Sequence, residues 1–484
     1  MDPAAAYASL AAERRPLMLA SASARPGEDP ALAGRWSFVM ADPMAVLTGR
    51  GWSSWCGTRL LIGDALRALR SMLERCAVPR ETWEGADEAL DSPLPPFRGG
   101  LAGFFGYELG GLLERLPPRR TDDLGLPDLA LGAYDAALAI DHATDRAYLV
   151  ASGMPARTPG ERRARAESRL AWLHERLDRS GPLRPLRWNA DSMRVAAPGS
   201  TFDRPSYEAA VARVIEYIRA GDAFQVNLSQ RFSASLADGD DALALFRRLA
   251  VISPVPLAAL IDLGDAQVVS ASPELFLRVI GRTVETKPIK GTRPRGVDPR
   301  WDAQWAAELL ASGKDRAENV MIVDLLRNDL SRVCEDGSVQ VPRLCALESY
   351  ANVHHLVSTV TGTLRPGADA LDLLRASFPG GSITGAPKVR AMEIIAELEP
   401  TVRGPYCGAL GYLGFDGDMD LAIAIRTAVV RDGRLYFHAG GGITAESDPA
   451  MEYEETIAKA RPFAAAASSV RSPRAVRHEG DARP

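Results

Sequence analysis

Cysteine, histidine and long apolar runs are all scarce in this sequence. Five cysteines are scattered among 484 residues, and no Cys-x-x-Cys pair occurs. An odd, unpaired set of this kind indicates a reduced, cytoplasmic protein and excludes a cysteine zinc site. Of the six histidines only His354 and His355 are neighbours. Any bound metal is therefore expected to take carboxylate ligands, which favours a hard cation such as Mg²⁺.

Membrane and nucleic-acid functions are not expected either. No apolar run reaches membrane-spanning length, and the start of the chain lacks a charged segment followed by an apolar one. The net charge of −5 argues against a general nucleic-acid binder. Hydrophobic residues make up 46% and charged residues 25% of the chain, which is typical of a soluble globular protein.

The chain divides into regions of different composition. Residues 1–190 form an N-terminal region with a dense glycine and aromatic segment at Phe97 to Tyr107. Residues around 196–200 have the composition of a linker, and residues 200–465 are richer in motifs and form the predicted catalytic domain. Residues 472–484 are basic and poor in apolar residues, so a disordered tail is expected there.

Hydrophobic periodicity predicts strands that pair locally and helices that do not alternate with them. Apolar runs joined by short turns predict an antiparallel meander over Leu257–Asp262, Gln267–Ala271, Leu275–Ile280 and Thr283–Lys287. A hairpin is expected around Asp432-Gly433. Helices are predicted at Pro159–Arg179, Pro205–Ala220, Ala303–Ala311, Ala317–Leu326, Pro387–Leu398 and Pro449–Arg461. This pattern favours an α+β fold with antiparallel sheets and outer helices.

Lys290 and Glu274 are the two candidates for acid–base or nucleophilic chemistry. Lys290 lies between an apolar residue and a glycine in a Pro/Gly-bounded loop, where desolvation would lower the pKa of its amine. The alternative is a lysine in a basic surface loop. Glu274 lies between two apolar strands, where burial would raise its pKa and suit it to general acid catalysis. The alternative is a surface glutamate at a strand edge.

A second set of residues suggests a cation site and an anion site. Glu452 and Glu455 are three apart on a predicted helix, so their carboxylates share a face and call for a compensating charge such as Mg²⁺. They could equally be an ordinary acidic first turn. The preceding Gly440-Gly441-Gly442 allows close backbone approach to a ligand, or forms a bulge.

Other candidates carry less specific signals. The loop from Gly380 to Lys388 leads into a helix and could cradle a carboxylate, or simply cap the helix. Arg426, in an apolar strand, needs an anionic partner from the protein or from a substrate. Glu318 could be a metal ligand or a helix N-terminal charge, and His355 fits a core histidine as well as a ligand.

Together these segments resemble the chorismate-utilising enzymes, which include anthranilate, aminodeoxychorismate, isochorismate and salicylate synthases. The matching segments run in order from about Tyr207 to Pro462, with a looser match at Trp36 to Pro43 and Gly99 to Gly110. They are Ser272-Pro273-Glu274, Pro288-Ile289-Lys290-Gly291-Thr292, Asp324 to Leu330, Gly380 to Lys388, Ala424 to Thr427 and Glu452 to Thr456. The resemblance implies an antiparallel β-sheet sandwich surrounded by helices, to which residues 1–190 contribute.

Two positions discriminate among members of the family. Lys290 stands where aminodeoxychorismate synthases have lysine and anthranilate synthases typically have alanine. Gln225 stands where isochorismate and salicylate synthases carry a water-activating lysine, and its amide cannot act as that base. The resemblance therefore implies amination of chorismate to 4-amino-4-deoxychorismate on the p-aminobenzoate and folate route. Anthranilate synthase component I is the alternative, and a chorismate-binding or tryptophan-sensing subunit without catalysis is a third reading.

The resemblance also assigns roles to individual residues. Lys290 would be the nucleophile and Glu274 the general acid. Mg²⁺ would be held by Glu318 and Glu455, with Glu452 close by. The residues expected to contact chorismate are Gln225, His355, Thr384, Gly385, Tyr406, Arg426, Gly442 and Lys459.

Ammonia is expected to come from a partner protein. No cysteine has the glycine-flanked context of an amidotransferase nucleophile, so the resemblance implies a separate glutamine amidotransferase subunit, component II. Some relatives also hold a tryptophan molecule between N-terminal strands. The corresponding residues here are Ser21 or Ser23 and Trp36, although the Leu17–Ser23 stretch departs from the family pattern.

Overall fold

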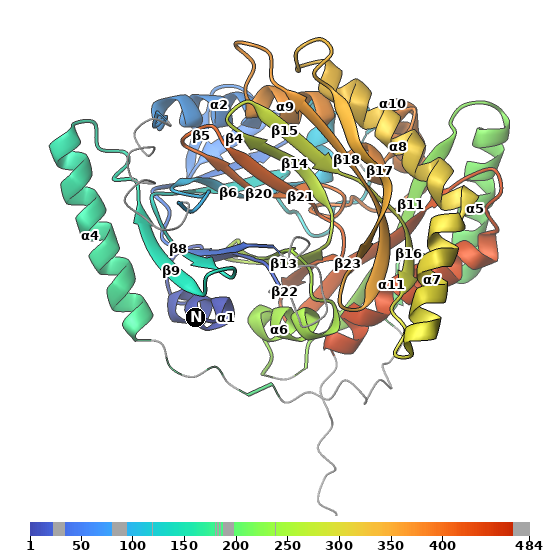
Figure 1. The fold of residues 1–484 in the computed structure, drawn as a ribbon, viewed down its shortest axis with the longest axis horizontal. Helices are drawn as coiled ribbons and strands as arrows, with labels where there is room; N and C mark the ends of the chain where they lie inside the picture. The colour runs from blue at the N-terminus through green and yellow to red at the C-terminus, as the bar shows by residue number, and fades with distance from the viewer. Residues whose placement is uncertain are drawn as a thin grey trace, which may run out of the picture.

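A computed structural model describes most of the chain as two antiparallel sheets packed face to face with helices outside (Figure 1). The described residues are 1–22, 34–79, 94–118, 120–179, 181, 183, 185–186, 198–237 and 239–467. The predicted tail at 472–484 and the alternative residue Ser23 lie outside these ranges.

Each sheet contains strands from the N-terminal and C-terminal parts of the chain. The first sheet, in spatial order, consists of β10 (Gly199–Ser200), β11 (Gln225–Ser235), β23 (Arg434–Ile443), β22 (Thr427–Arg431), β13 (Gln267–Ser272), β12 (Leu257–Asp262), β1 (Leu17–Ala20), β2 (Trp36–Met40), β8 (Ala136–Asp141) and β9 (Arg146–Ala151), with β19 (Gly385–Ala386) on β11. The second consists of β16 (Ile289–Pro294), β18 (Val353–Thr363), β15 (Thr283–Lys287), β14 (Leu275–Ile280), β21 (Met419–Ile423), β20 (Ala409–Gly414), β6 (Gly100–Phe105), β7 (Leu129–Tyr134), β3 (Ala45–Arg50), β4 (Ser53–Cys56) and β5 (Arg59–Leu61), with β17 (Gln340–Ser349) on β18.

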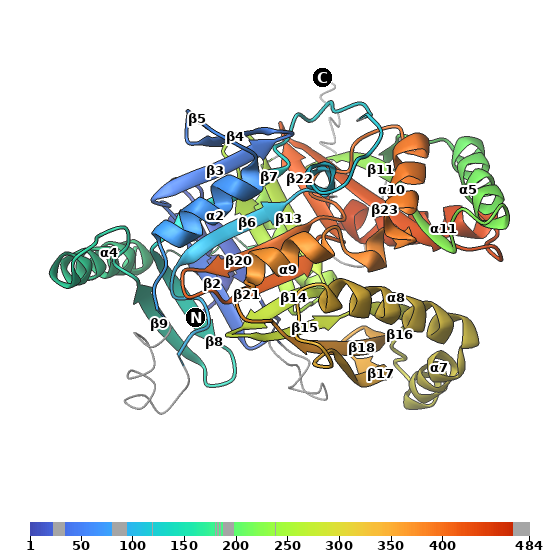
Figure 2. The same ribbon diagram turned by 90° about the horizontal axis from the view of Figure 1, so that it is seen from above.

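The helices lie on the outer faces and at one end of the sandwich (Figures 1 and 2). They are α1 (Pro3–Leu10), α2 (Ala65–Arg75), η1 (Tyr107–Leu112), α4 (Pro159–Asp178), α5 (Arg204–Arg219), α6 (Ala242–Ile252), α7 (Pro299–Ala311), α8 (Gly313–Ser331), α9 (Ala370–Ser377), η2 (Gly381–Ile383), α10 (Lys388–Leu398) and α11 (Pro449–Ala467). In the described ranges no helix is both long and apolar enough to cross a membrane.

The alternation of side chains along the strands divides the core into three apolar layers. On β20, Leu410 and Tyr412 pack between the sheets, whereas Leu413 packs under the helices of the other face. On β8, Ala137 and Ala139 lie between the sheets and Leu138 faces the helices. Two sheets with helices outside are the predicted α+β sandwich.

The predicted helices form, with longer ends where capping or burial supports them. Helix α7 begins at Pro299 because the side chain of Asp298 accepts a hydrogen bond from the Arg300 backbone amide. Helix α11 continues through Pro462 to Ala467, where Phe463 and the alanines that follow are buried. Burial thus extends this helix beyond the predicted end at Arg461.

The predicted four-stranded meander is wrong. Strands β12 and β13 pair with each other in the first sheet, and β14 and β15 pair with each other in the second. The chain crosses between the sheets at Ser272-Pro273-Glu274. Proline cannot donate a ladder hydrogen bond, so it ends the pairing of β13. The Glu274 carbonyl instead accepts a hydrogen bond from the Ile423 amide of β21. The crossing places Glu274 between the two sheets.

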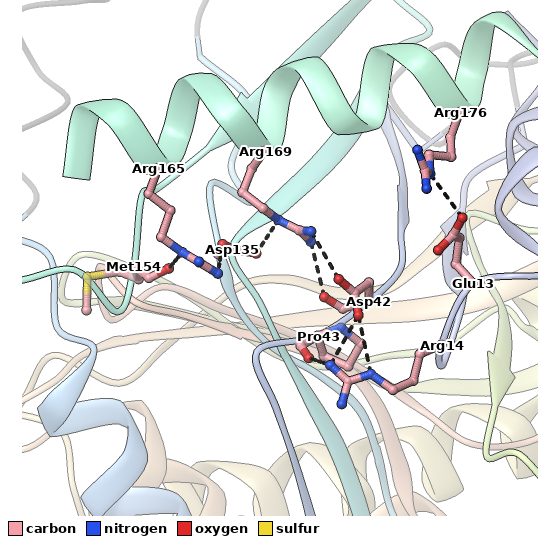
Figure 3. Close-up of polar contacts among 9 residues, drawn as sticks. All are labelled: Glu13, Arg14, Asp42, Pro43, Asp135, Met154, Arg165, Arg169 and Arg176. Carbon is pink, nitrogen blue, oxygen red and sulfur yellow. Dashed lines mark hydrogen bonds and ion pairs between the residues drawn. The ribbon is translucent and has the colours of Figure 1, made fainter. Parts of the chain in front are cut away.

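Helix α4 is fastened to the edge of the sandwich mainly by arginine–aspartate pairs (Figure 3). Only Leu173 and Leu177 of this helix are buried. Arg165 and Arg169 both pair with Asp135, whose side chain is fully buried, at 2.8 and 3.1 Å. Arg169 also pairs with Asp42 at 3.1 Å. Because the Asp135 carboxylate has left water, it depends on these guanidinium groups for compensation.

We therefore expect Asp135→Asn to lower the free energy of unfolding by about 2–3 kcal/mol, since two guanidinium groups lose a buried anionic partner. The urea midpoint measures this. Glu167→Gln, which removes an exposed ion pair with Arg163 on the same helix, is the control and should change stability by less than about 0.5 kcal/mol. Equal effects of the two substitutions would show that α4 is not held by the Asp135 pairs.

Candidate active site

Glu274 is a buried carboxyl group that accepts hydrogen bonds from a serine hydroxyl and from the Ile289 backbone amide. Its side chain is 4% exposed, and its Oε1 accepts a hydrogen bond from Ser382 Oγ at 2.6 Å. Burial raises the pKa of Glu274 to about 7, against the lowering effects of the Ser382 hydrogen bond and of Lys290. The predicted direction of this pKa shift is confirmed. At neutral pH the site therefore holds a substantial fraction of a protonated carboxylic acid.

Lys290 lies beside the same serine. Its Nζ donates to the Ser382 backbone carbonyl at 3.2 Å. Burial lowers the pKa of Lys290, while the carboxylates of Glu318 and Glu274 oppose that effect. The predicted direction of the pKa shift is confirmed here too, and the alternative of a solvated lysine in a surface loop does not hold. A lowered pKa increases the fraction of neutral, nucleophilic amine.

Glu452 and Glu455 lie on one face of α11, as their spacing predicts, and both point at the triple glycine of β23. A Cβ placed on Gly441 would lie 2.8 Å from Glu452 Oε2 and 3.3 Å from Glu455 Oε1, so only glycine leaves room for both carboxylates there. Glu452 is buried, and burial together with the charge of Glu455 raises its pKa. This excess of negative charge calls for a cation.

Glu318 approaches the same glycines from α8 through Gln225. The Gln225 Nε2 donates to Glu318 Oε2 at 3.4 Å, and a Cβ at Gly442 would lie 2.3 Å from that nitrogen. Within the described ranges, no three histidine, cysteine, aspartate or glutamate side chains are close enough to share a metal ion. The oxygen donors around Gly441 and Gly442 fit a hard cation in ligand type.

Arg426 is a partly buried cation, and within the described ranges its side chain makes one hydrogen bond, to a neutral group. Its Nη1 donates to Ser253 Oγ at 3.1 Å, and burial lowers its pKa. Among the described residues, no aspartate or glutamate forms an ion pair with it. The sequence left open whether its anionic partner is protein or substrate, and the structure offers no such protein carboxylate. The guanidinium is available to an anionic ligand.

His355 lies near this cation on β18. Its Nδ1 is 2.9 Å from Thr292 Oγ1 of β16, two residues beyond Lys290. Burial, with a further contribution from Arg426, lowers the pKa of His355 to about 3. The imidazole is therefore neutral at physiological pH and can exchange hydrogen bonds without adding charge.

The remaining residues predicted to contact a substrate differ in burial and in the partners that they already have. Thr384 and Gly385 follow η2, and the Thr384 hydroxyl donates to the Gly380 carbonyl at 3.0 Å. Tyr406 is buried and stacks on His438 with ring centroids 5.0 Å apart. Lys459 is half exposed and already pairs with Glu455 at 2.6 Å, so it neutralises that carboxylate here.

Ser21 and Trp36 lie apart from these residues, on the wall of a cavity of about 620 Å³ between the sheets. The Ser21 hydroxyl is hydrogen-bonded to the backbone carbonyls of Trp36 and Pro256 at 2.8 and 2.7 Å. It therefore shapes the wall. Pro273 and Ile289 also line the cavity. These residues directly precede Glu274 and Lys290 in the sequence, so the cavity adjoins the two candidates.

Sequence reasoning missed two features of the site. Ser382 stood inside a recognised motif, but its contacts reach residues about a hundred positions away. The buried pair of Arg403 and Glu399, at 2.6 Å, was also missed. Arg403 donates to the backbone carbonyls of Ile383 and Asn227, so it supports the loops of the site from below. A charged pair spaced i, i+4 within an apolar stretch was the available signal.

Comparison with known proteins identifies the family to which the chain belongs. Residues 53–465 match the model of the chorismate binding enzymes. The chain belongs to this family. It is 43% identical over 429 residues to aminodeoxychorismate synthase component 1 of Salmonella typhimurium, covering 88% of each chain. It is also 46% identical over 405 residues to anthranilate synthase component 1 of Thermus thermophilus, covering 84% of this chain and 83% of that one.

Solved structures agree with the fold of this chorismate binding enzyme. Anthranilate synthase component I from Streptococcus pneumoniae superposes with a TM-score of 0.77 at 33% identity, covering 89% of this chain and 92% of that one. Its similarity confirms the predicted fold class. Relatives with two different reactions match at comparable identity, so the choice between those reactions depends on the residues of the site.

Arg403 and Arg426 should respond differently to substitution. Arg403→Met leaves Glu399 without its partner and should lower the free energy of unfolding by about 3 kcal/mol. Arg426→Met removes a desolvated charge that has no carboxylate partner among the described residues, so stability should stay the same or rise. Thermal unfolding without ligand measures both. A large loss of stability in Arg426→Met would show that the protein itself satisfies this cation.

Proposed function

We propose that this enzyme aminates chorismate at C4 to form 4-amino-4-deoxychorismate, with Lys290 as nucleophile and Glu274 as general acid. The observation that carries the proposal is the pairing of a desolvated lysine and a desolvated glutamate on one serine. Burial favours the neutral amine and the neutral acid. These are the protonation states that nucleophilic attack with proton donation requires.

The neutral Lys290 amine attacks C2 of the ring. The ring double bond shifts, the C4–O bond breaks, and Glu274 gives its proton to the departing hydroxyl, which leaves as water. Ammonia then forms the new bond at C4, the double bond shifts back, and the lysine nitrogen leaves C2 as a neutral amine. Glu274 recovers its proton from the product ammonium. Chorismate and ammonia are thus converted to the amino product and water, and both residues return to their starting states.

Chorismate carries two carboxylates, and the cations of the site suit them. We propose that Arg426, whose guanidinium donates to the Ser253 hydroxyl, pairs with one carboxylate, and that Tyr406, Thr384 and Gly385 make further contacts to the substrate. We propose that Mg²⁺, held by Glu318 and Glu455 with Glu452 close by, neutralises the ring carboxylate when bound. Lys459, Gln225, Gly442 and His355 complete the proposed substrate contacts.

The ammonia would be supplied by a separate glutamine amidotransferase. All five cysteines are free, but burial raises the pKa of Cys407, the one beside Tyr406, to about 12. A thiol of this kind is a poor nucleophile for glutamine hydrolysis. The component 1 label of both curated relatives supports the same division of labour. We also propose that tryptophan occupies the cavity at Ser21 and Trp36, which is wide enough and partly aromatic.

Anthranilate synthesis is the competing function, and one assay separates the two. The pure chain is incubated with chorismate, Mg²⁺ and an ammonium salt. We expect aminodeoxychorismate without pyruvate, whereas anthranilate with pyruvate would establish the competing reaction. In the same assay Lys290→Ala should lose at least about a hundredfold in turnover, since it lacks the nucleophile. Calorimetry should show chorismate binding largely retained.

Lys287→Ala is the matched control for that substitution. Lys287 lies three residues away on β15, is 3.9 Å from Glu285 and lines the cavity behind the site. Its loss should leave turnover within about twofold of the unaltered enzyme, as for most surface substitutions. Full amination by Lys290→Ala would rule out the lysine nucleophile.

The metal assignment predicts a contrast between adjacent glutamates. Glu455→Gln should raise the Mg²⁺ concentration needed for half-maximal activity at least about tenfold, because a coordinating charge is lost. Glu454→Gln should not, since Glu454 points away and pairs with the exposed Arg204 at 2.8 Å. Calorimetric titration with Mg²⁺ alone gives a second readout that does not need turnover. Equal Mg²⁺ affinities in the two variants would place the cation elsewhere.

A further inference from the structure

Ser382 is in contact with both groups proposed to react. Its backbone carbonyl accepts from Lys290 Nζ at 3.2 Å, and its hydroxyl donates to Glu274 Oε1 at 2.6 Å. Lys290 is the second residue of β16 and Glu274 directly precedes β14, and these strands are not neighbours in the second sheet. A third element, η2, therefore connects the nucleophile to the acid.

The segment that carries Ser382 is fixed from several sides. Gly381 packs directly against Leu325 of α8, and Gly380 packs against Ile423 of β21. The next carbonyl, that of Ile383, accepts from Arg403 Nη1 at 3.2 Å. The Ser382 carbonyl itself also accepts from Asn227 Nδ2 at 3.3 Å. With its neighbours held in this way, Ser382 can impose a direction on both reacting groups.

The directions of these hydrogen bonds have chemical consequences. A neutral amine that donates one N–H to the Ser382 carbonyl keeps its lone pair pointed away from that carbonyl. A carboxylic acid whose Oε1 accepts from a hydroxyl carries its own proton on Oε2. Ser382 thus selects which oxygen of Glu274 is the donor and which way Lys290 can attack.

We infer that Ser382 is a positioning residue that couples the proton donor Glu274 to the nucleophile Lys290. The inference rests on the proposed function, and it adds a residue to which the motif alone gives no role. Ser382 touches the reacting groups and has no reacting atom of its own. Its loss should therefore reduce the rate of the chemical step more than it weakens substrate binding.

The charges facing the two groups come from four elements. Lys290 faces Glu274, Glu318 of α8, and Glu455 and Lys459 of α11. Glu274 faces Lys290, the Ser382 hydroxyl and the backbone amide of Ile289, and each of these lowers its pKa. Removal of the hydroxyl should let Glu274 keep its proton to higher pH, because the ionised form loses a donor. The substitution alters none of the other side chains that face the two groups.

Ser382→Ala, Ser382→Thr and Ser377→Ala form the test set. Ser377 is a matched control because its buried hydroxyl has no hydrogen-bond partner among the described residues. At a constant concentration of free ammonia, turnover should decline above about pH 7 as Glu274 ionises. In Ser382→Ala we expect kcat to fall roughly tenfold with little change in KM, and this decline to move to higher pH. Ser382→Thr and Ser377→Ala should resemble the unaltered enzyme.

A measurement without substrate separates this inference from the proposed function. Acetic anhydride labels neutral amines, and peptide mass spectrometry then gives the pH at which Lys290 is half labelled. In Ser382→Ala, Glu274 stays neutral to higher pH and stabilises the Lys290 ammonium less, so half-labelling should move to lower pH. In a Glu274→Gln background the same substitution should have no effect. If the unaltered enzyme makes no aminodeoxychorismate, the proposed function fails while the labelling still decides the coupling. Unchanged labelling of Lys290 together with an unchanged pH profile of turnover in Ser382→Ala would overturn the coupling of Glu274 and Lys290 by Ser382.

Discussion

Desolvation of a carboxyl group at the crossing between the sheets is the constraint on which the site depends. Pro273 ends one strand, and the chain enters the other sheet at Glu274, which is only 4% exposed. A carboxylate in that place is costly, so the neutral acid is favoured. Burial also disfavours the charged form of Lys290, and because that form is a cation its pKa is lowered. Two residues that would be ions in water are thereby brought towards their neutral forms side by side.

Arg403 and Arg426 show how the fold separates a charge that serves the structure from a charge that is available to a ligand. Arg403 has its own carboxylate, Glu399, and uses its remaining donors on backbone carbonyls beneath the site. Among the described residues, the Arg426 side chain hydrogen-bonds only to the Ser253 hydroxyl. The first arrangement is complete without a ligand, and the second is completed by an anion. A dianionic substrate would thus find both a rigid floor and an unsatisfied cation.

Local patterns in the sequence predicted helices α4, α5, α7, α8, α10 and α11 and the hairpins β12–β13, β14–β15 and β22–β23, but not α1, α2, α6 or α9. They also singled out Lys290 and Glu274 as candidates. Apolar flanks around Lys290 and Glu274 were sufficient to predict the directions of their pKa shifts. The crossing at Ser272-Pro273-Glu274 was not predicted, because the strands on both sides of it have the same apolar pattern. Ser382 and Arg403 were missed because their partners are distant in sequence or on another element. Long-range contacts of this kind have no periodic signature.

Both sheets pair strands from the start of the chain with strands made much later, and this limits how far the chain can fold on the ribosome. Strand β1 pairs with β12, and β6 pairs with β20, so early strands wait for partners that are made some 240 to 300 residues later. At 5–20 residues per second, roughly, that interval lasts tens of seconds. Throughout it the nascent chain carries unpaired β edges and an uncovered apolar face, which are the features that chaperones recognise. Closure of either sheet has to await nearly complete synthesis, and the catalytic cleft forms among the last parts of the molecule.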